Sequence, residues 1–350
     1  RDVAPSRGLG DVYKRQAYNL ENYIAAALQS VLVQTFQDFE IIIVDDGSSD
    51  ETVSIIQSFH DPRIRLVSQV NSGVSRARNA GMKKAVGAYI AFLDGDDYWY
   101  PEHLELAADF FNRHPEILAY ANRYMRDELE AIPPRPPSYP ESIRRLGIRG
   151  MLFMNSSSVI LNSSLASRLP PWEEAMPYGE DGLYWTRCMR GTGLIGLGGS
   201  VTSIYRQRAS SAMHDEHYQH VSLHSLIAPL LNELEAMKNP KWQFAVHYLV
   251  IRELHPKRLL SLNAEERISL TGRIRKIMHP CLNRPFLDSY MKACSARAGM
   301  EQSFSALMDR TMFSCKWLDR LERMGRSLFF RLQTNNGMGG KHQDPVLSRS

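Results

Sequence analysis

Three carboxylates stand close together in the stretch AFLDGDDYW, residues 91–99. Asp94, Asp96 and Asp97 come directly after an apolar run. Clustered carboxylates repel each other unless a cation lies among them, and hard oxygen ligands of this kind suit Mg²⁺ or Mn²⁺. Such a metal keeps coordination positions open for a diphosphate and neutralises the charge that develops as the diphosphate leaves. The stretch therefore predicts a metal and diphosphate site.

The stretch DGDD has three other interpretations. An EF-hand loop needs Asp or Asn at its fifth position and Gly at its sixth, where this chain has Tyr98 and Trp99. A phosphatase with an aspartyl nucleophile, DxDx[TV], likewise meets Tyr98 at its last position. An Asp-rich structural turn is the simplest alternative, because Asp and Gly dominate turns. We expect Trp99 to pack in the core.

Alternating strands and helices surround these carboxylates. The apolar run Ile41–Val44 in FEIIIVDDGSSDET reads as a strand covered on both faces, AYIAFLD (88–94) as another buried strand, and IRLVS (64–68) as a further strand. Apolar residues at helical spacing predict helices after Asn19, a candidate N-cap, and after Ser48, while SRARNAGMKKAVG (75–87) predicts a third. This β-α-β-α-β order predicts an α/β fold, with a doubly wound, mostly parallel sheet flanked by helices.

Two acidic clusters fall at the same edge of this predicted sheet. In open α/β sheets, ligands bind beyond the carboxyl ends of the strands. Asp45 and Asp46 end one predicted strand, and the DGDD cluster ends another. We expect both clusters to face one crevice.

The rest of the chain divides into less regular parts. A helix is expected from Pro101 to His114, a strand over 151–161, a helix over 179–191 closed by Gly191, and glycine-interrupted strands over 193–206. The proline-rich stretch IPPRPPSYP (132–140) breaks this order. From about residue 215 the pattern is mainly helical. We predict a catalytic domain over 17–214 and a helical, basic C-terminal region over 215–350.

The N-terminal segment 1–16 is anomalous. The residues before Ala17 should supply the first strand of such a sheet, but they read DVYKRQ, with Lys14 and Arg15 in place of apolar residues. If residues 1–16 belong to the fold, that fold must do without a normal first strand.

Composition indicates a globular cytoplasmic protein. The chain has 350 residues, is 43% hydrophobic and has four cysteines without CxxC spacing, which fits a reducing compartment. It shows neither the apolar run of a membrane span nor the apolar core of a signal peptide.

Positive charge gathers in the C-terminal region. Residues 231–350 hold 20 Lys/Arg against 11 Asp/Glu, and KWLDRLERMGRSLFFRL (316–332) forms an amphipathic basic pattern. Such a helix suits peripheral contact with the inner face of a membrane, although packing on the catalytic domain explains the same stripe. A solvated basic face or nucleic acid would also fit the charge alone, and no nucleic-acid partner is predicted.

Five motifs occur in an order that resembles one enzyme family. They are YN (18–19), VDDGSSDET, NSGVSRARNAG, GAYIAFLDGDDYW and GEDGLYWTRCMRG, and together they span residues 17–210. This series is similar to the inverting family 2 glycosyltransferases with a GT-A fold. The resemblance implies transfer of one monosaccharide from a nucleoside-diphosphate sugar, expected to be UDP-linked, to a hydroxyl of a glycan or lipid-linked glycan. It also implies Mn²⁺ or Mg²⁺ dependence and a role in bacterial cell-envelope polysaccharide biosynthesis.

The resemblance assigns the nucleotide-sugar contacts to the first three motifs. Tyr18 would stack on the base, while Asp45 and Asp46 would hydrogen-bond the base or ribose. Either Arg76 or Arg78 would meet the diphosphate or base, next to the turn at Gly73. One residue shifts the helical face by about 100°, so the spacing leaves both arginines open.

The remaining contacts fall in the last two motifs and beyond. Asp94 and Asp96 would form the DxD pair, with Asp96 or Asp97 on the metal. Asp181 would be the catalytic base, with Glu180 beside it on the donor. The site residues that the resemblance implies also include Arg206 or Arg208 on a phosphate.

The sequence departs from the family pattern at two points, and these bear on the expected reaction. The family commonly shows YRxH where this chain has YRQR, and the QxxRW motif of processive synthases is absent. Transfer of a single sugar is therefore expected. The alternative is a non-catalytic nucleotide-sugar-binding protein of the same fold, and the presence of both the DxD pair and Asp181 favours the enzyme.

Overall fold

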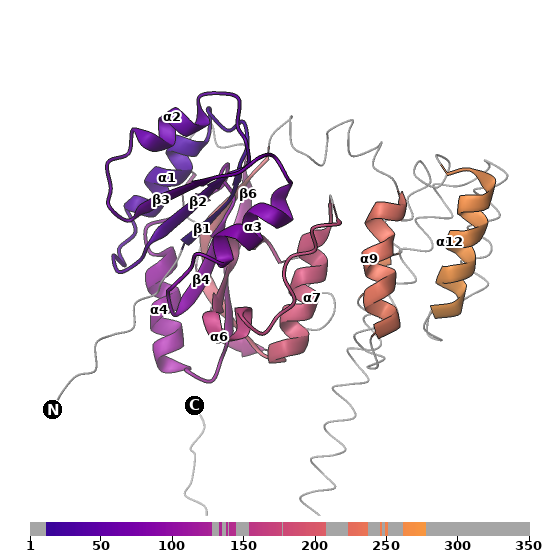
Figure 1. Cartoon of the computed structure of the whole chain (residues 1–350). Coiled ribbons are helices and arrows are strands. Elements are labelled where there is room, and N and C mark those ends of the chain that lie inside the picture. The colour runs from indigo at the N-terminus through magenta and orange to yellow at the C-terminus, as the bar shows by residue number, and fades with distance from the viewer. Residues whose placement is uncertain are drawn as a thin grey trace, which may run out of the picture.

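A computed structural model describes residues 12–127, 133–134, 138, 140–144, 154–176, 178–207, 223–236, 246, 249–250 and 262–277. It is an α/β structure in which one central sheet is covered by helices on both faces (Figure 1). The strands of this sheet are β1 Val12–Ala17, β2 Ile41–Asp45, β3 Ile64–Ser68, β4 Tyr89–Leu93, β5 Tyr98–Trp99, β6 Ala119–Asp127, β7 Ser142–Arg144, β8 Val159–Asn162 and β9 Ile195–Arg206. The helices are α1 Ile24–Leu32, α2 Thr52–Gln57, α3 Val74–Met82, α4 His103–Arg113, α6 Ser163–Ala166, α7 Glu180–Thr192, α9 Leu223–Ala236 and α12 Ala264–Ile277.

The sheet is mostly parallel, as predicted. Its strand order is β3-β2-β1-β4-β8-β6-β9-β5, with β7 paired to β9. Strands β1 to β4 are parallel neighbours, and β6 runs parallel to β9. Strand β8 is antiparallel to β4 and β6, while β5 and β7 are antiparallel to β9. The carboxyl ends of β2, β4 and β9 therefore lie at one edge.

Alternate residues of the buried strands serve two separate cores. Ile41 and Ile43 of β2 pack with apolar side chains of α1, α2 and α4. Ile42 and Val44 face the opposite side and pack with α3, α6 and α7. Because successive strand residues point to opposite faces, a continuous apolar run requires helices on both sides. The sequence pattern of β2 and β4 thus explains the layered arrangement.

The expectation that the fold lacks a normal first strand is wrong. Residues Val12–Ala17 form β1, which pairs with β2 on one side and β4 on the other. Lys14 lies opposite Ile43 of β2 and Leu93 of β4, and the register with β2 shifts between Lys14 and Ala17. Strand pairing uses backbone groups, so polar side chains do not prevent it.

Three details of the predicted helices are corrected. Helix α1 begins at Ile24, and Asn19 is not its cap: Asn19 has a φ of 51°, and its side chain accepts a hydrogen bond from the Ser49 backbone N–H (3.0 Å). Ser48 does not cap α2, which begins after Glu51. Helix α7 runs past Gly191 to Thr192 and ends in a left-handed turn at Gly193. A contact between loops therefore replaces the Asn19 cap, whereas a local turn at Gly193 ends α7.

Two further expectations were wrong in extent. The strand expected over 151–161 is a 3₁₀ turn, Ser156–Ser158, followed by β8, and the interrupted strands expected over 193–206 are the single strand β9. The described C-terminal helices α9 and α12 share the core cluster of α7. Arg208 and residues 316–332 lie outside the described residues. No helix in the described part of the chain combines the length and apolar character needed to cross a membrane.

Candidate active site

The three aspartates after β4 lie in different environments. Asp97 is buried, and both of its carboxylate oxygens accept hydrogen bonds, one from the Ser157 hydroxyl (2.6 Å) and one from the Arg206 backbone N–H (3.0 Å). Burial, with the carboxylates of Asp94 and Asp96 nearby, raises the pKa of Asp97 well above its usual range. Asp96 is partly exposed, whereas Asp94 is buried. Only Asp96 therefore offers a solvent-accessible carboxylate here.

Ser157 links the two buried aspartates, a role that sequence reasoning missed. Its hydroxyl accepts a hydrogen bond from the Asp94 backbone N–H (3.0 Å) and donates to Asp97. Its carbonyl accepts the indole N–H of Trp99 (2.6 Å), which is fully buried, as expected. The repeated serines of NSSS (155–158) were the only signal, and a serine run alone has no single structural meaning. The antiparallel placement of β8 beside β4 brings Ser157 here.

Arg206, at the end of β9, closes the same edge. Its backbone N–H binds Asp97, and its guanidinium Nε donates to the Asp96 carbonyl (2.9 Å). The guanidinium carbon also lies 5.1 Å from the ring centroid of Tyr23. This cation–π contact holds the arginine over the loop between β1 and α1. Arg206 is thus placed beside Asp96, and Tyr23 is a neighbour that the motifs did not indicate.

The carboxylates after β2 hold loops together. Asp46 is fully buried and accepts hydrogen bonds from the Gln69 amide (2.6 Å) and from the backbone N–H groups of Ser72 and Gly73 (both 2.9 Å). Asp45 is buried and accepts one from the Ser48 backbone N–H (3.1 Å). Asp46 therefore fixes the turn before α3, including Gly73.

The aromatic residue expected on the base is accessible. Tyr18 is 43% exposed and directly follows β1, which lies between β2 and β4. An exposed phenol ring beside a polar edge is suited to stacking on a planar base.

The two candidate arginines of α3 point in different directions. The Arg76 side chain is 56% exposed and pairs with Glu174 (3.0 Å). The Arg78 side chain is 1% exposed and pairs with Glu180 (2.9 Å), whose side chain is 4% exposed. Arg78 is therefore the inward arginine, a choice that spacing left open.

Asp181 lies in the first turn of α7, directly after Glu180. Gly179 precedes the helix in a left-handed conformation, with a φ of 76°, which favours glycine at this position. The Asp181 side chain is partly exposed and accepts a hydrogen bond from the Gly182 backbone N–H (2.7 Å). Its carboxylate is thus available to a substrate, in contrast with that of Glu180.

The residues at this edge fit a divalent cation that is shared with a ligand. Within the described ranges, no three His, Cys, Asp or Glu side chains gather into a protein-only metal site. Mg²⁺ and Mn²⁺ do not require one, because one or two carboxylates plus phosphate oxygens and water complete their shells. Asp96 is the carboxylate that fits, since both oxygens of Asp97 are already bonded inside the protein.

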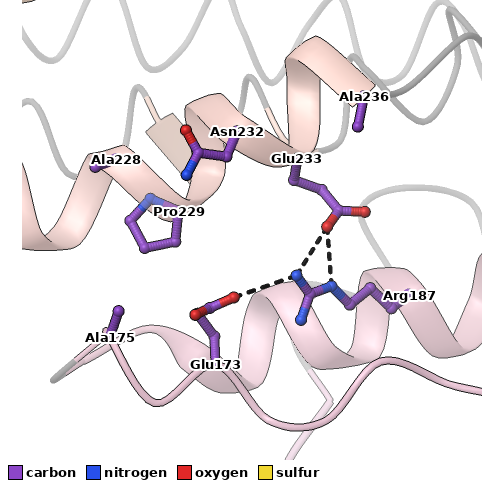
Figure 2. A pocket seen from close by; sticks show the side chains of 8 residues that line it. All are labelled: Glu173, Ala175, Arg187, Ala228, Pro229, Asn232, Glu233 and Ala236. Carbon is purple, nitrogen blue, oxygen red and sulfur yellow. Dashed lines mark hydrogen bonds and ion pairs between the residues drawn. The ribbon is translucent and has the colours of Figure 1, made fainter.

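A separate cavity lies beside the helix that carries Asp181. Figure 2 shows its walls, which come from the segment before α7, from α7 and from α9. Its volume is about 440 Å³, and Arg187 on its floor pairs with Glu233 of α9 (2.8 Å) and Glu173 (3.4 Å). None of the predicted nucleotide, metal or base residues lines it. The cavity therefore marks where α9 joins the catalytic domain, away from the predicted site.

Comparisons with known proteins identify the family and the fold. The model of "Glycosyl transferase family 2" matches residues 16–165. A protein of Escherichia coli named "UDP-Glc:alpha-D-GlcNAc-diphosphoundecaprenol beta-1,3-glucosyltransferase WfgD" is 30% identical over 201 residues, which cover 56% of this chain and 76% of that protein. The chain belongs to glycosyltransferase family 2.

Further relatives and solved structures are similar to this family 2 glycosyltransferase. An uncharacterized glycosyltransferase of Rickettsia felis is 43% identical over 108 residues, which are 30% of this chain but only 18% of that protein. The crystal structure of S. aureus TarS 1-349 with UDP-GlcNAc has a TM-score of 0.63 at 19% identity, covering 86% of this chain and 90% of that one. A mannosyltransferase from Pyrobaculum calidifontis, in complex with GDP-Man and Mn²⁺, has a TM-score of 0.51 at 16% identity, with 89% and 90% covered. These structural neighbours confirm the GT-A fold.

Proposed function

We propose that this family 2 glycosyltransferase transfers one monosaccharide from a UDP-sugar to a hydroxyl of a lipid-linked glycan, with inversion at the anomeric carbon. The observation that carries the proposal is the contrast among four acidic residues at one edge. Asp97 and Glu180 are engaged inside the protein, whereas Asp96 and Asp181 remain accessible. One accessible carboxylate suits a metal and the other suits a base.

The donor would lie across the ends of β1, β2 and β4. Tyr18 would stack on the base, while Asp45 and Asp46, both buried and bonded to backbone N–H groups, would hold the loops that border the base and ribose. Arg206 beside Asp96 would bind the diphosphate, since a guanidinium matches phosphate geometry. Mn²⁺ or Mg²⁺, bound through Asp96, would stabilise the charge on the leaving diphosphate.

Asp181 would act as the general base. Its carboxylate takes the proton of the acceptor hydroxyl while that oxygen attacks the anomeric carbon from the side opposite the diphosphate. The new glycosidic bond then has the inverted configuration, the UDP leaves, and the proton passes from Asp181 to water. A partly exposed carboxylate at the start of α7 can reach an acceptor without being blocked by an internal ion pair.

The names of two relatives support the proposed acceptor class. WfgD and a second E. coli protein, WfaP, are named as glucosyltransferases that act on alpha-D-GlcNAc-diphosphoundecaprenol. We extend this acceptor type, a sugar linked through diphosphate to a polyprenyl chain, to the present protein. Cell-envelope polysaccharide biosynthesis is the corresponding role.

A panel of nucleotide sugars tests the proposal. UDP-glucose, UDP-GlcNAc and GDP-mannose are scored for Mn²⁺-dependent binding and for slow donor hydrolysis, with Asp109→Asn as the control because Asp109 is an exposed acid on α4. We expect Asp96→Ala to weaken Mn²⁺-dependent binding, and Asp181→Asn to bind normally but lose turnover by about 10²–10⁴-fold. Unchanged hydrolysis in both variants would refute the proposal. Donor binding without any wild-type turnover would support the non-catalytic alternative.

A further inference from the structure

The buried ion pair between Arg78 and Glu180 joins α3 to the first residue of α7. Arg78 Nη1 lies 2.9 Å from Glu180 Oε1, and the two side chains are 1% and 4% exposed. The Arg78 guanidinium carbon also lies 3.9 Å from the centroid of the Trp172 ring. The pair is therefore enclosed by protein, and one wall of the enclosure is aromatic.

The aromatic wall is itself held by α3. The Asn79 side chain accepts a hydrogen bond from the Trp172 backbone N–H and donates to the Trp172 carbonyl, both at 2.9 Å. Trp172 then stacks on Tyr184 of α7, with ring centroids 3.9 Å apart and planes 8° apart. Consecutive residues of α3 thus fix both the segment before α7 and, through Glu180, the start of that helix.

The same helix is fixed at its other end to the donor edge. Asp46, at the end of β2, accepts the Gly73 backbone N–H that immediately precedes α3. A continuous set of contacts therefore runs from the end of β2 through α3 to Glu180, the residue before Asp181. A shift of α7 would separate Glu180 from Arg78 and leave each charge buried without its partner, which is costly. The ion pair therefore favours one position for the start of α7.

We infer that Arg78 and Glu180 are positioning residues that orient Asp181, rather than contacts to the nucleotide sugar. Successive side chains on a helix are turned by about 100°. With Glu180 directed inward at Arg78, Asp181 is directed toward the more exposed side of α7, where it is found. This inference rests on the proposed function, because it assigns the pair a role through the proposed base.

Enzyme kinetics with donor binding, and hydrogen exchange, test this positioning role. The variants are Arg78→Met, Arg78→Lys and the double variant Arg78→Met/Glu180→Met. The control is Arg65→Met, which removes an ion pair of the same 2.9 Å length to Glu40 but from a side chain that is 51% exposed. We expect Arg78→Met to lower kcat for UDP-sugar hydrolysis by about 100-fold, the loss typical of a catalytic group displaced by about 1 Å, with the Kd for the donor within threefold of wild type. Arg78→Lys should restore part of kcat. The double variant, which leaves no lone buried charge, should recover Tm without recovering kcat.

Hydrogen exchange separates this inference from the proposed function. Amides at 179–183 should exchange faster in Arg78→Met and in the double variant than in wild type, while Arg65→Met leaves them unchanged. This readout needs no turnover, so it holds even if no donor in the panel is hydrolysed. Unchanged exchange at 179–183, recovery of kcat together with Tm in the double variant, or a donor Kd that rises in proportion to the loss of kcat would each overturn the inference.

Discussion

At the scale of single residues, the site depends on which carboxylates the protein itself uses. Asp96 and Asp97 are neighbours of the same type, yet one is partly exposed and the other has both oxygens bonded to Ser157 and Arg206. Position in the chain does not distinguish them. The two aspartates differ because Arg206 of β9 and Ser157 of the turn before β8 bind the carboxylate of Asp97.

Substitution of these two aspartates should separate binding from stability. We expect Asp96→Ala to lower Mn²⁺-dependent UDP binding at least tenfold and leave Tm nearly unchanged. Asp97→Ala should cost about 1–3 kcal/mol of unfolding free energy, because a buried hydroxyl and a buried N–H lose their acceptor. Calorimetric titration and urea unfolding measure the two effects. The opposite pattern would place the metal on Asp97.

His103 makes stability depend on pH. Its ring is fully buried, stacks on Trp99 and binds Thr202 through Nδ1 (2.8 Å), and burial lowers its pKa to about 3. The unfolded chain takes up a proton near pH 6.5 while the folded protein does not, so folding stability falls as pH drops from 6.5 toward 3. His103 contributes a loss on the order of 2 kcal/mol between pH 6.5 and pH 5, while the raised pKa of Asp97 acts in the opposite direction. The effect of His103 is therefore the difference in urea-unfolding stability between wild type and His103→Asn across this range. His103→Asn should remove most of this loss, and an equal slope in the variant would contradict the assignment.

At the scale of elements, the close packing of β9 against α4 and against side chains of β6 explains two of its glycines. A Cβ on Gly196 would meet the Phe110 ring directly, and a Cβ on Gly198 would meet the Asn122 and Tyr120 side chains. The sequence showed these glycines as interruptions, although the strand is continuous because each one admits a neighbouring side chain.

Gly196→Ala should therefore destabilise the protein. The added methyl group must displace a fully buried phenylalanine, and overpacking of this kind costs about 1–3 kcal/mol. Gly272→Ala in α12 is the matched control, because no atom lies within 4 Å of the added Cβ and alanine favours a helix. Thermal unfolding of both variants gives the comparison. Equal Tm values for the two would show that β9 can shift away from α4.

At the scale of the whole molecule, the described C-terminal helices share one hydrophobic core with α3 and α7. Apolar side chains of α9 and α12 join the cluster that contains α3 and α7, and Figure 1 shows α9 facing α7. Glu233 of α9 accepts hydrogen bonds from Arg187 and Arg190 of α7. Arg273 of α12 then binds Glu235 of α9. Packing and ion pairs together fix α9 against the helix that carries Asp181.

Removal of Glu233 should weaken this junction. Its side chain is 12% exposed and serves two arginines, so Glu233→Ala should cost about 3 kcal/mol, near the lower end for a broken buried pair. Because the helices share one core, we expect a single unfolding transition in the wild type, by both calorimetry and circular dichroism. Two separate transitions in the wild type would show that the C-terminal helices unfold on their own. Glu235→Ala, at a 47% exposed position, is the control and should cost under 1 kcal/mol.

The sequence by itself determined the order of elements and predicted the chemistry of the site. Apolar runs such as Ile41–Val44 can be satisfied only in a sheet covered on both faces, and their length and punctuation fixed β2, β3 and β4 to within two residues. The motif order identified the family, and the strand-end carboxylates indicated a metal and a diphosphate. These features are local in the chain, so they can be read from it.

Only the tertiary structure decided which of the two candidate arginines points inward and which of the two neighbouring aspartates is exposed to solvent. Arg78 rather than Arg76 points inward because Glu180 and Trp172 arrive from about a hundred residues away, and Asp96 rather than Asp97 is accessible because Ser157 and Arg206 bind Asp97. The formation of β1 from a polar segment also depends on the tertiary structure, because its backbone pairs with β2 and β4. Such outcomes depend on partners that are distant in sequence, and no local pattern encodes the partner of a buried charge.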